Sequence, residues 1–239
     1  HFVAKGFVAV AINYRLGIKE GAKPEEMTDD HIMKAVSMAC EDLFDATAFI
    51  IANAGEWNID PGKIIISGGS AGAITCLTAE YLLCSGGGPA GTLPADFNYA
   101  GIISHAGCVI VPGDTLIWEK TPCPMLLMHG SVDNMVPFDT RSGSGSIYGG
   151  SNYLHRQFTA LGLPHWLYEE AGADHIVALK PLQHNFGETD TFIEKFVLEG
   201  KHAIVHTVCA DEKPDSMNDM MKVVPWYIMG WEKTDDEMK

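Results

Sequence analysis

No stretch of the 239-residue sequence approaches the roughly 18 consecutive apolar residues that a membrane-spanning helix needs. The beginning of the sequence also lacks the charged, apolar and small-residue regions of a signal peptide, so any such peptide would lie upstream of His1 and the location of the protein stays open. Internal repeats are missing as well. These absences argue against a membrane span and against a repeat architecture.

Basic residues are scarce. The chain has 16 Lys and Arg residues against 31 Asp and Glu residues, and its formal net charge is −15. A field of this sign repels nucleic acids and anionic lipid surfaces, so we expect neither as a partner. The charge serves solubility.

Metal and disulfide signatures are also lacking. The six cysteines form no CxxC pair, and most stand in apolar surroundings that are typical of buried free thiols. His202 and His206 have the spacing of metal ligands on a helix, with Cys209 nearby, but the Glu of an H-E-x-x-H motif is absent. We therefore expect no metal and no other cofactor, and the redox compartment is left open.

Apolar runs alternate with helical patterns along most of the chain. Strands are predicted at residues 6–13, 63–67, 99–107, 124–130 and 165–172, and helices at 29–54, 71–84, 151–162 and 189–200. Flexible loops are predicted at 84–98, 112–124 and 141–151. This alternation indicates an α/β fold with a mainly parallel sheet flanked by helices. No periodicity is evident after residue 200, so we expect a domain at 1–200 and a C-terminal extension at 201–239.

A lone serine stands between the second strand and its helix. Gly68-Gly69-Ser70-Ala71-Gly72 is a G-x-S-x-G match at a strand-to-helix corner, the setting of a nucleophile elbow. Gly68 and Gly72 would remove side chains that collide around so tight a turn. The Ser70 hydroxyl then lies above the helix N-terminus, where the Ala71 N–H favours developing negative charge. The alternative is a glycine-rich turn that only packs the helix on the strand.

A nucleophilic serine needs a base and an orienting acid, which in this arrangement follow in the order acid, then histidine. Asp133 follows the strand at 124–130 and His175 follows the strand at 165–172, so we predict a Ser70–Asp133–His175 triad. The alternatives to Asp133 as the orienting acid are Asp139, Asp174, Glu169 and Glu170. His129 is expected to be structural, and His105, which follows the third strand, is expected to pack there, with lining of the pocket as the alternative.

With these residues in order, the chain resembles α/β-hydrolase esterases of the hormone-sensitive-lipase and feruloyl or acetylxylan esterase type. The segments that carry the resemblance are AINYRLG (11–17), NIDPGKIIISGGSAGA (58–73), LLMHGSVDNMVPF (126–138) and AGADHI (171–176). The resemblance implies hydrolysis of small acyl esters through an acyl-enzyme, with acetyl and feruloyl esters of plant polysaccharide as candidate substrates. Ser70 would attack, His175 would carry the proton, Asp133 would hold the imidazole, and Ala71 would supply half of an oxyanion hole.

One part of the family pattern is missing. The loop that carries an HGGG-type motif, and with it the other half of the oxyanion hole, does not precede residues 11–17. We therefore expect an N-terminally truncated α/β-hydrolase with its first strands missing, in which residues 7–13 pair with 63–67 or with another copy. The alternatives are a serine peptidase of the same fold and a catalytically inactive binding protein. A small-molecule or saccharide ester is the expected partner, and homo-oligomer formation is left open.

Overall fold

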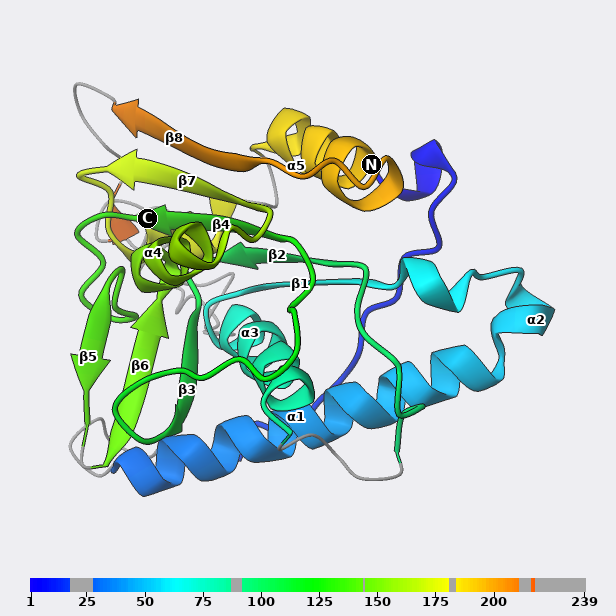
Figure 1. Cartoon of the computed structure of the whole chain (residues 1–239), viewed down its shortest axis with the longest axis horizontal. Helices are drawn as coiled ribbons and strands as arrows, with labels where there is room; N and C mark the ends of the chain where they lie inside the picture. Colours follow the sequence, from blue (N-terminus) through cyan, green and yellow to red (C-terminus); the bar gives the residue numbers. More distant parts are fainter. Residues whose placement is uncertain (18–27, 87–91, 144, 181–183, 211–215, 218–239) are drawn as a thin grey trace, which may run out of the picture.

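A computed structural model describes residues 1–17, 28–86, 92–143, 145–180, 184–210 and 216–217. Its main sheet has five parallel strands in the order β1-β2-β4-β7-β8 (Figure 1). The strands are β1 (Ile65–Gly69), β2 (Gly101–His105), β4 (Met125–Gly130), β7 (His165–Ala171) and β8 (Ile204–Ala210). The predicted mainly parallel α/β sheet is confirmed.

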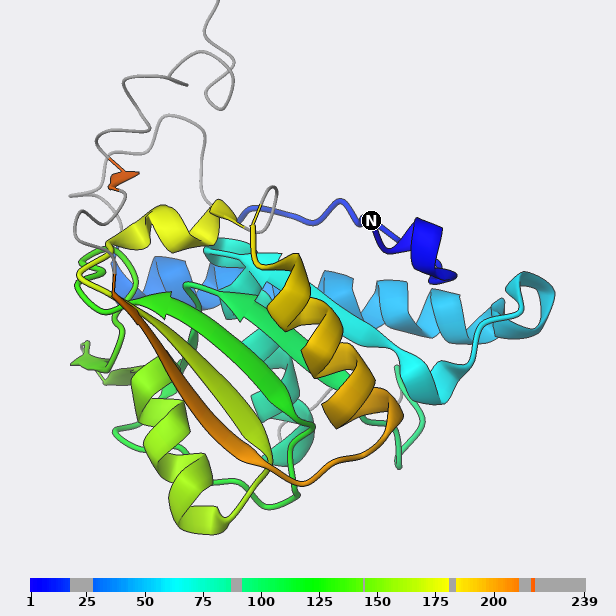
Figure 2. The same cartoon turned by 90° about the horizontal axis from the view of Figure 1, so that it is seen from above.

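Helices cover both faces of this sheet. One face carries α1 (Asp29–Ala52), α3 (Ala71–Cys84) and α4 (Ser151–Leu161), and the other carries η4 (His175–Ala178), α5 (Phe186–Phe192) and the π-helical turn η6 (Ile193–Leu198). Figure 2 shows α5 in front of the strands and α1 behind them. The structure also has the short helical segments η1 (Val3–Lys5), α2 (Ala54–Trp57) and η3 (Pro61–Lys63).

The central strands bury both of their faces. On β2 and β4, Ile102 and Leu127 pack with α1, α3 and α4, whereas Ile103, Leu126 and Met128 pack with η4, α5 and η6. Successive side chains of a strand point to opposite faces, so a strand covered on both sides needs apolar residues at every position. This requirement explains the uninterrupted apolar runs from which the strands were predicted.

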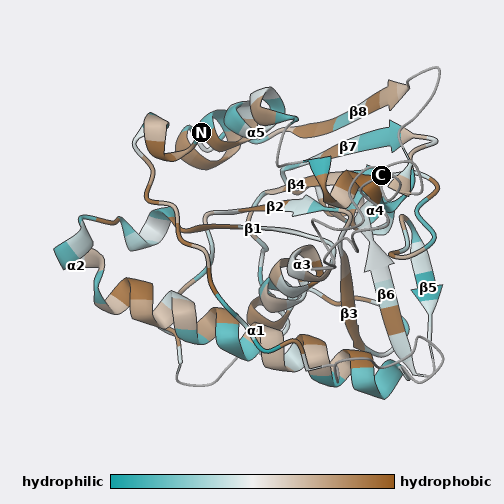
Figure 3. Cartoon of the chain, turned by 180° about the vertical axis from the view of Figure 1, so that it is seen from behind, coloured by the Kyte–Doolittle hydropathy of each residue, from teal (hydrophilic) through white to brown (hydrophobic). Residues whose placement is uncertain are grey.

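A second, antiparallel sheet stands beside the first and was not predicted. It consists of β3 (Cys108–Pro112), β6 (Ser146–Gly150) and β5 (Thr140–Ser142), in the order β3-β6-β5. Figure 3 shows β3 as hydrophobic and β5 as hydrophilic. The prediction of a flexible loop at 141–151 is therefore wrong, because buried Ile147 and Tyr148 anchor β6 against β3 despite the surrounding glycines and serines.

The predicted strand at residues 6–13 is also wrong. The segment forms neither helix nor strand, Val8 and Val10 are exposed, and among the described strands β1 lies at the edge of the sheet. A backbone without a hydrogen-bonding partner forms no ladder, however apolar its side chains are. Pairing of 7–13 with 63–67 is excluded for the same reason. Arg15 fixes the end of this segment to α1 instead, through hydrogen bonds to Asp42.

The sheet continues past residue 200, where we expected the domain to end. All seven residues of β8 are in register with β7. Exposure alternates along β8, with Ile204 and Val208 both exposed, so the strand does not have the continuous apolar signature of the central strands. This mixed pattern explains why no element was predicted there.

Candidate active site

Ser70 occupies a strained corner between β1 and α3. Its backbone has φ 52° and ψ −120°, a region that residues with a side chain rarely adopt. The Ser70 N–H donates to the His105 carbonyl at 2.9 Å, and the Ser70 carbonyl accepts the first hydrogen bond of α3 from the Ile74 N–H. The strand-to-helix turn predicted from the G-x-S-x-G motif is present.

The two outer glycines of the motif differ in their surroundings. A Cβ atom on Gly68 would lie 2.3 Å from the carbonyl carbon of Gly72, whereas a Cβ atom on Gly72 would meet nothing within 4 Å. Gly69 is also confined, since its Cβ would lie 2.3 Å from the Ala178 carbonyl oxygen. The steric role predicted for Gly68 is confirmed, and the one predicted for Gly72 is wrong.

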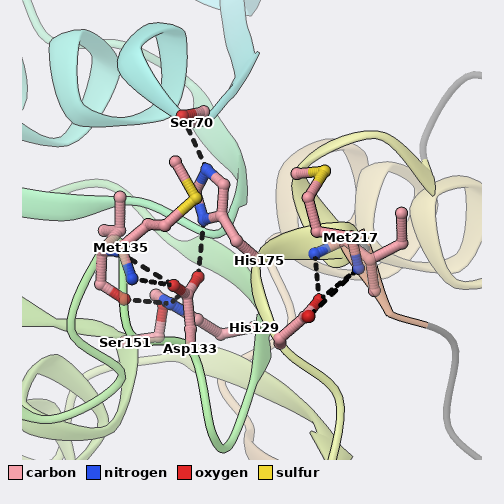
Figure 4. A network of polar contacts seen from close by, with 10 residues as sticks. Ser70, His129, Asp133, Met135, Ser151, His175 and Met217 are labelled. Atoms are coloured by element: carbon pink, nitrogen blue, oxygen red, sulfur yellow. Dashed lines mark hydrogen bonds and ion pairs between the residues drawn. The ribbon is translucent and has the colours of Figure 1, made fainter. Parts of the chain in front are cut away.

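The three predicted side chains meet in one chain of hydrogen bonds (Figure 4). His175 Nε2 lies 2.8 Å from Ser70 Oγ, and His175 Nδ1 lies 2.7 Å from Asp133 Oδ2. Ser70, Asp133 and His175 follow β1, β4 and β7, respectively. The carboxyl ends of parallel strands share one edge of the sheet. This shared edge brings residues from distant parts of the sequence into contact.

The Asp133 carboxylate is buried and fully engaged. Its Oδ1 accepts from the N–H groups of Met135 and Val136, both at 2.9 Å, and its Oδ2 contacts His175 and, at 3.3 Å, His129 Nε2. Burial alone raises the pKa of Asp133, but hydrogen bonds from His129, His175 and the Val136 N–H hold that pKa well below its ordinary value. The carboxyl is therefore ionised at neutral pH.

An ionised Asp133 determines where the imidazole proton lies. The carboxylate only accepts hydrogen bonds, so His175 Nδ1 must carry the hydrogen that faces it. In the neutral ring, Nε2 then has a free lone pair directed at the Ser70 hydroxyl. This geometry allows His175 to remove the Ser70 proton.

The four acids that were alternatives to Asp133 bind other groups. Asp139 contacts Arg156, Asp174 accepts from the N–H groups of Ile176 and Met217, Glu169 contacts His206, and Glu170 contacts Lys180. Asp174, although adjacent to His175 in sequence, caps the start of η4.

The two histidines expected to be structural have different surroundings. His105 is buried, its Nδ1 lies 3.3 Å from the Gly68 carbonyl oxygen, and burial lowers its pKa to about 4. His129 touches the carboxylate of Asp133, a contact that the sequence analysis missed. The available signal was its place near the end of β4, four residues before Asp133.

Ala71 is the first residue of α3, directly after Ser70. Its N–H therefore lies at the end of the helix where the macrodipole is positive, as an oxyanion donor requires.

Among the described residues, no three His, Cys, Asp or Glu side chains are arranged to hold a metal ion. No described helix combines the length and apolar character needed to cross a membrane.

Residues 1–82 match the BD-FAE family model, which describes esterase-type α/β-hydrolases. The match covers 82 of the 239 residues and confirms the resemblance inferred from the sequence. The parallel sheet with helices on both faces agrees with the architecture of α/β-hydrolases. The match includes Ser70 and Ala71 but ends before Asp133 and His175. The assignment of those two residues therefore rests on their geometry.

Three solved structures are similar to this chain at low identity. MGS-M1, an α/β-hydrolase from a Medee basin deep-sea metagenome library, is 16% identical with a TM-score of 0.41, and the match covers 68% of this chain and 55% of that one. A truncated carbohydrate esterase from gut microbiota is 20% identical with a TM-score of 0.44, and the match covers 65% of this chain and 67% of that one. The esterase Est2 of Thermogutta terrifontis is 19% identical with a TM-score of 0.44, and the match covers 76% of this chain and 68% of that one. The chain thus spans little more than half of the first and about two thirds of the others. TM-scores in this range carry no functional argument. No curated protein sequence matches the chain.

Proposed function

We propose that this chain is the catalytic part of a serine carboxylic-ester hydrolase, with Ser70 as nucleophile, His175 as general base and Asp133 as orienting acid. The observation that carries the proposal is the pair of contacts on the two nitrogens of His175, 2.8 Å to Ser70 and 2.7 Å to Asp133. A hydroxyl, an imidazole and an ionised carboxylate in this order form the arrangement that activates a serine for acyl transfer.

The reaction follows from this geometry. Ser70 Oγ attacks the ester carbonyl carbon while His175 Nε2 takes the hydroxyl proton, and the Asp133 carboxylate stabilises the imidazolium that forms. The Ala71 N–H donates to the developing oxyanion. When the tetrahedral intermediate collapses, His175 returns the proton to the departing alcohol and an acyl-Ser70 ester remains. Water, deprotonated by the same imidazole, then releases the acid and restores Ser70.

Two observations favour ester hydrolysis over the alternatives. The BD-FAE match supports an esterase more than a serine peptidase, and it covers the segment that contains Ser70. A catalytically inactive binding protein has no need to keep a strained serine, a base and a buried carboxylate in contact. Acetyl and feruloyl esters are the substrates to examine first, since the sequence resemblance points to them.

A panel of acetate, butyrate and ferulate esters, with a peptide anilide added, tests this proposal on the full-length protein. We expect ester turnover, and we expect Ser70→Ala to lower it by about 10⁴-fold or more because triad members act as a unit. Ser67→Ala is the matched control, since Ser67 is an exposed serine on the same strand. Turnover that survives Ser70→Ala at a tenth of the original rate would contradict the assignment of the nucleophile. Cleavage of the anilide without the esters would favour the peptidase.

A further inference from the structure

A second serine–histidine pair lies behind Asp133. His129 Nδ1 is 2.8 Å from Ser151 Oγ, and His129 Nε2 is 3.2 Å from the Val136 carbonyl oxygen and 3.3 Å from Asp133 Oδ2. His129 and Ser151 are both fully buried. Figure 4 shows them on the side of Asp133 that faces away from Ser70.

The contacts of His129 determine its tautomer. Its Nε2 faces a carbonyl oxygen and a carboxylate oxygen, both of which only accept hydrogen bonds, so Nε2 carries the hydrogen. In the neutral ring Nδ1 is then the acceptor, and the Ser151 hydroxyl donates to it. The hydrogen bonds therefore run in one direction, from Ser151 through His129 to Asp133.

The loop that carries Asp133 is fitted tightly to the element that carries Ser151. Ser151 is the first residue of α4, directly after β6. A Cβ atom on Gly150 would lie 1.9 Å from the Pro137 carbonyl oxygen, and the Gly150 N–H donates to the Asp139 carbonyl at 2.6 Å. The Asn152 N–H donates to the Phe138 carbonyl at 2.8 Å. Backbone contacts on both sides of Ser151 thus fix its position relative to residues 137–139, which follow Asp133 in the chain.

We propose that His129 is a positioning residue for the reaction at Ser70, acting through Asp133, and that Ser151 orients the His129 ring by donating to its Nδ1. The proposal rests on the proposed function. His129 Nε2–H keeps the Asp133 carboxylate in the orientation in which Oδ2 meets His175 Nδ1, and it withdraws part of the negative charge from that oxygen. No atom of His129 needs to touch the substrate.

Apart from His175, the other described groups around Asp133 do not contact the carboxylate oxygen that His129 contacts. On its own loop, the carboxylate receives the N–H groups of Met135 and Val136, which bind Oδ1 and not the oxygen that faces His175. From β3, the Cys108 thiol interacts electrostatically with Asp133, and burial raises the pKa of Cys108 to about 12, so that this thiol is neutral. Among the residues that the structure describes, His129 is therefore the neighbour, besides His175, that contacts Oδ2.

Loss of the hydrogen bond from His129 should shift the pH dependence of the reaction in one direction, which can be measured. Without the hydrogen bond from His129, more negative charge remains on Asp133 Oδ2, and the imidazolium form of His175 persists to higher pH. The acidic limb of the kcat/KM profile then moves to higher pH. A carboxylate held less firmly also lowers kcat, by roughly tenfold for the loss of one charge-assisted hydrogen bond, and leaves KM unchanged.

Two substitutions in the full-length protein separate positioning from packing. His129→Gln keeps an N–H donor within reach of Asp133, and His129→Met fills a similar volume without one. We expect His129→Met to lower kcat about tenfold, to move the acidic limb upward and to shift the low-field NMR resonance of the proton between His175 Nδ1 and Asp133. His129→Gln should restore most of all three properties. An unchanged acidic limb and an unchanged resonance in His129→Met would overturn the proposal, whatever happens to stability.

Ser151→Ala decides the question if His129→Met does not fold. We expect the same changes in smaller measure, since His129 Nδ1 then loses the hydroxyl that orients the ring, and their absence would overturn the proposal. Ser146→Ala is the matched control, because Ser146 is a buried serine of β6 whose hydroxyl has no hydrogen-bond partner among the described residues. The NMR signal requires no turnover. Failure of the proposed function, seen as a wild-type protein without esterase activity, is thereby distinguished from failure of the positioning role.

Discussion

Ser70 and His175 are 105 residues apart in the sequence, and their Oγ and Nε2 atoms lie 2.8 Å apart. Three strands of one parallel sheet produce this contact and the one between His175 and Asp133, because each strand ends at the same edge. The relative positions of the three side chains therefore depend on sheet register together with the turns that follow β4 and β7. Changes at the site can be expected to affect activity before they affect the fold.

Asp133→Asn should abolish most of the proposed activity while the protein stays folded. The amide can present its N–H₂ group to His175 Nδ1, which then becomes the acceptor and leaves Nε2 without a free lone pair for Ser70. We expect kcat to fall by about 10⁴-fold, measured with the best ester of the panel at neutral pH. Asp139→Asn, which affects a more exposed acid paired with Arg156, is the control and should keep activity within a few fold. Equal losses in the two variants would contradict the role of Asp133.

Gly68→Ala and Gly72→Ala should differ sharply in stability. The new methyl group at position 68 would collide with the backbone of Gly72, so we expect the free energy of unfolding to fall by about 1–3 kcal/mol or more. At position 72 the methyl group meets no atom and replaces a helical glycine, so stability should be unchanged or up to about 1 kcal/mol higher. Urea unfolding of both variants provides the comparison. Similar destabilisation at the two positions would contradict the finding that, of the two, only position 68 lacks room for a side chain.

Glu80→Gln should stabilise the protein at high pH. Glu80 is buried, its Oε1 accepts from the Cys123 N–H at 2.7 Å, its Oε2 has no hydrogen-bond partner among the described residues, and burial raises its pKa. The folded state therefore holds the proton more tightly than the unfolded state, and the stability contributed by the protonated carboxyl is lost as pH rises through the raised folded pKa.

The measurement is urea unfolding from pH 4 to pH 9 with exposed Glu56→Gln as the control. We expect the stability advantage of Glu80→Gln to be greatest at pH 9, to shrink as pH falls and to be smallest near the ordinary carboxyl pKa of about 4.3. Glu56→Gln should show no such trend. A constant difference between Glu80→Gln and wild type across this range would show that Glu80 is not the titrating group.

Reaction with iodoacetamide should distinguish one cysteine from the other five. Five thiols are buried and free, as expected from their apolar surroundings, and Cys209 is partly exposed. Burial raises the pKa of Cys40, Cys76 and Cys108 to about 12 and also raises those of Cys84 and Cys123, so that little thiolate is available. We expect Cys209 to be alkylated first in the native protein and all six in urea, as mass spectrometry can follow. Early alkylation of Cys76 in the native state would contradict the burial.

The sequence predicted the elements whose signal is local. Ser70 could be predicted because a strained turn between a buried strand and a helix has a short, specific pattern, and Asp133 and His175 because each follows the end of a predicted strand, in the order acid, then histidine. Residues 6–13 are as continuously apolar as the central strands but form no strand, since pairing depends on a neighbouring backbone that composition does not reveal.

The missed features have a physical cause of the same kind. β8 is half exposed, and its place is determined by β7, a partner that is adjacent in space but distant in the sequence. His129 was classed as structural because one histidine in a strand carries no sign of what its ring will face. Its contact with Asp133 depends on a turn of the chain between the two residues and on Ser151 from another element. Such three-way contacts leave no periodic trace.

The position of β8 has a consequence for anyone who shortens this protein. A cut at residue 200, where the sequence pattern fades, would remove the whole strand that pairs with β7 and leave the seven β7 residues of that ladder facing solvent. It would also remove Met217, whose N–H binds the carboxylate of Asp174 at 2.9 Å, directly beside His175. A shortened chain would thus lose support for the base of the proposed triad. β8 and Met217, which the sequence pattern alone would treat as dispensable, contact the strand and the loop that lead to the base of the proposed triad.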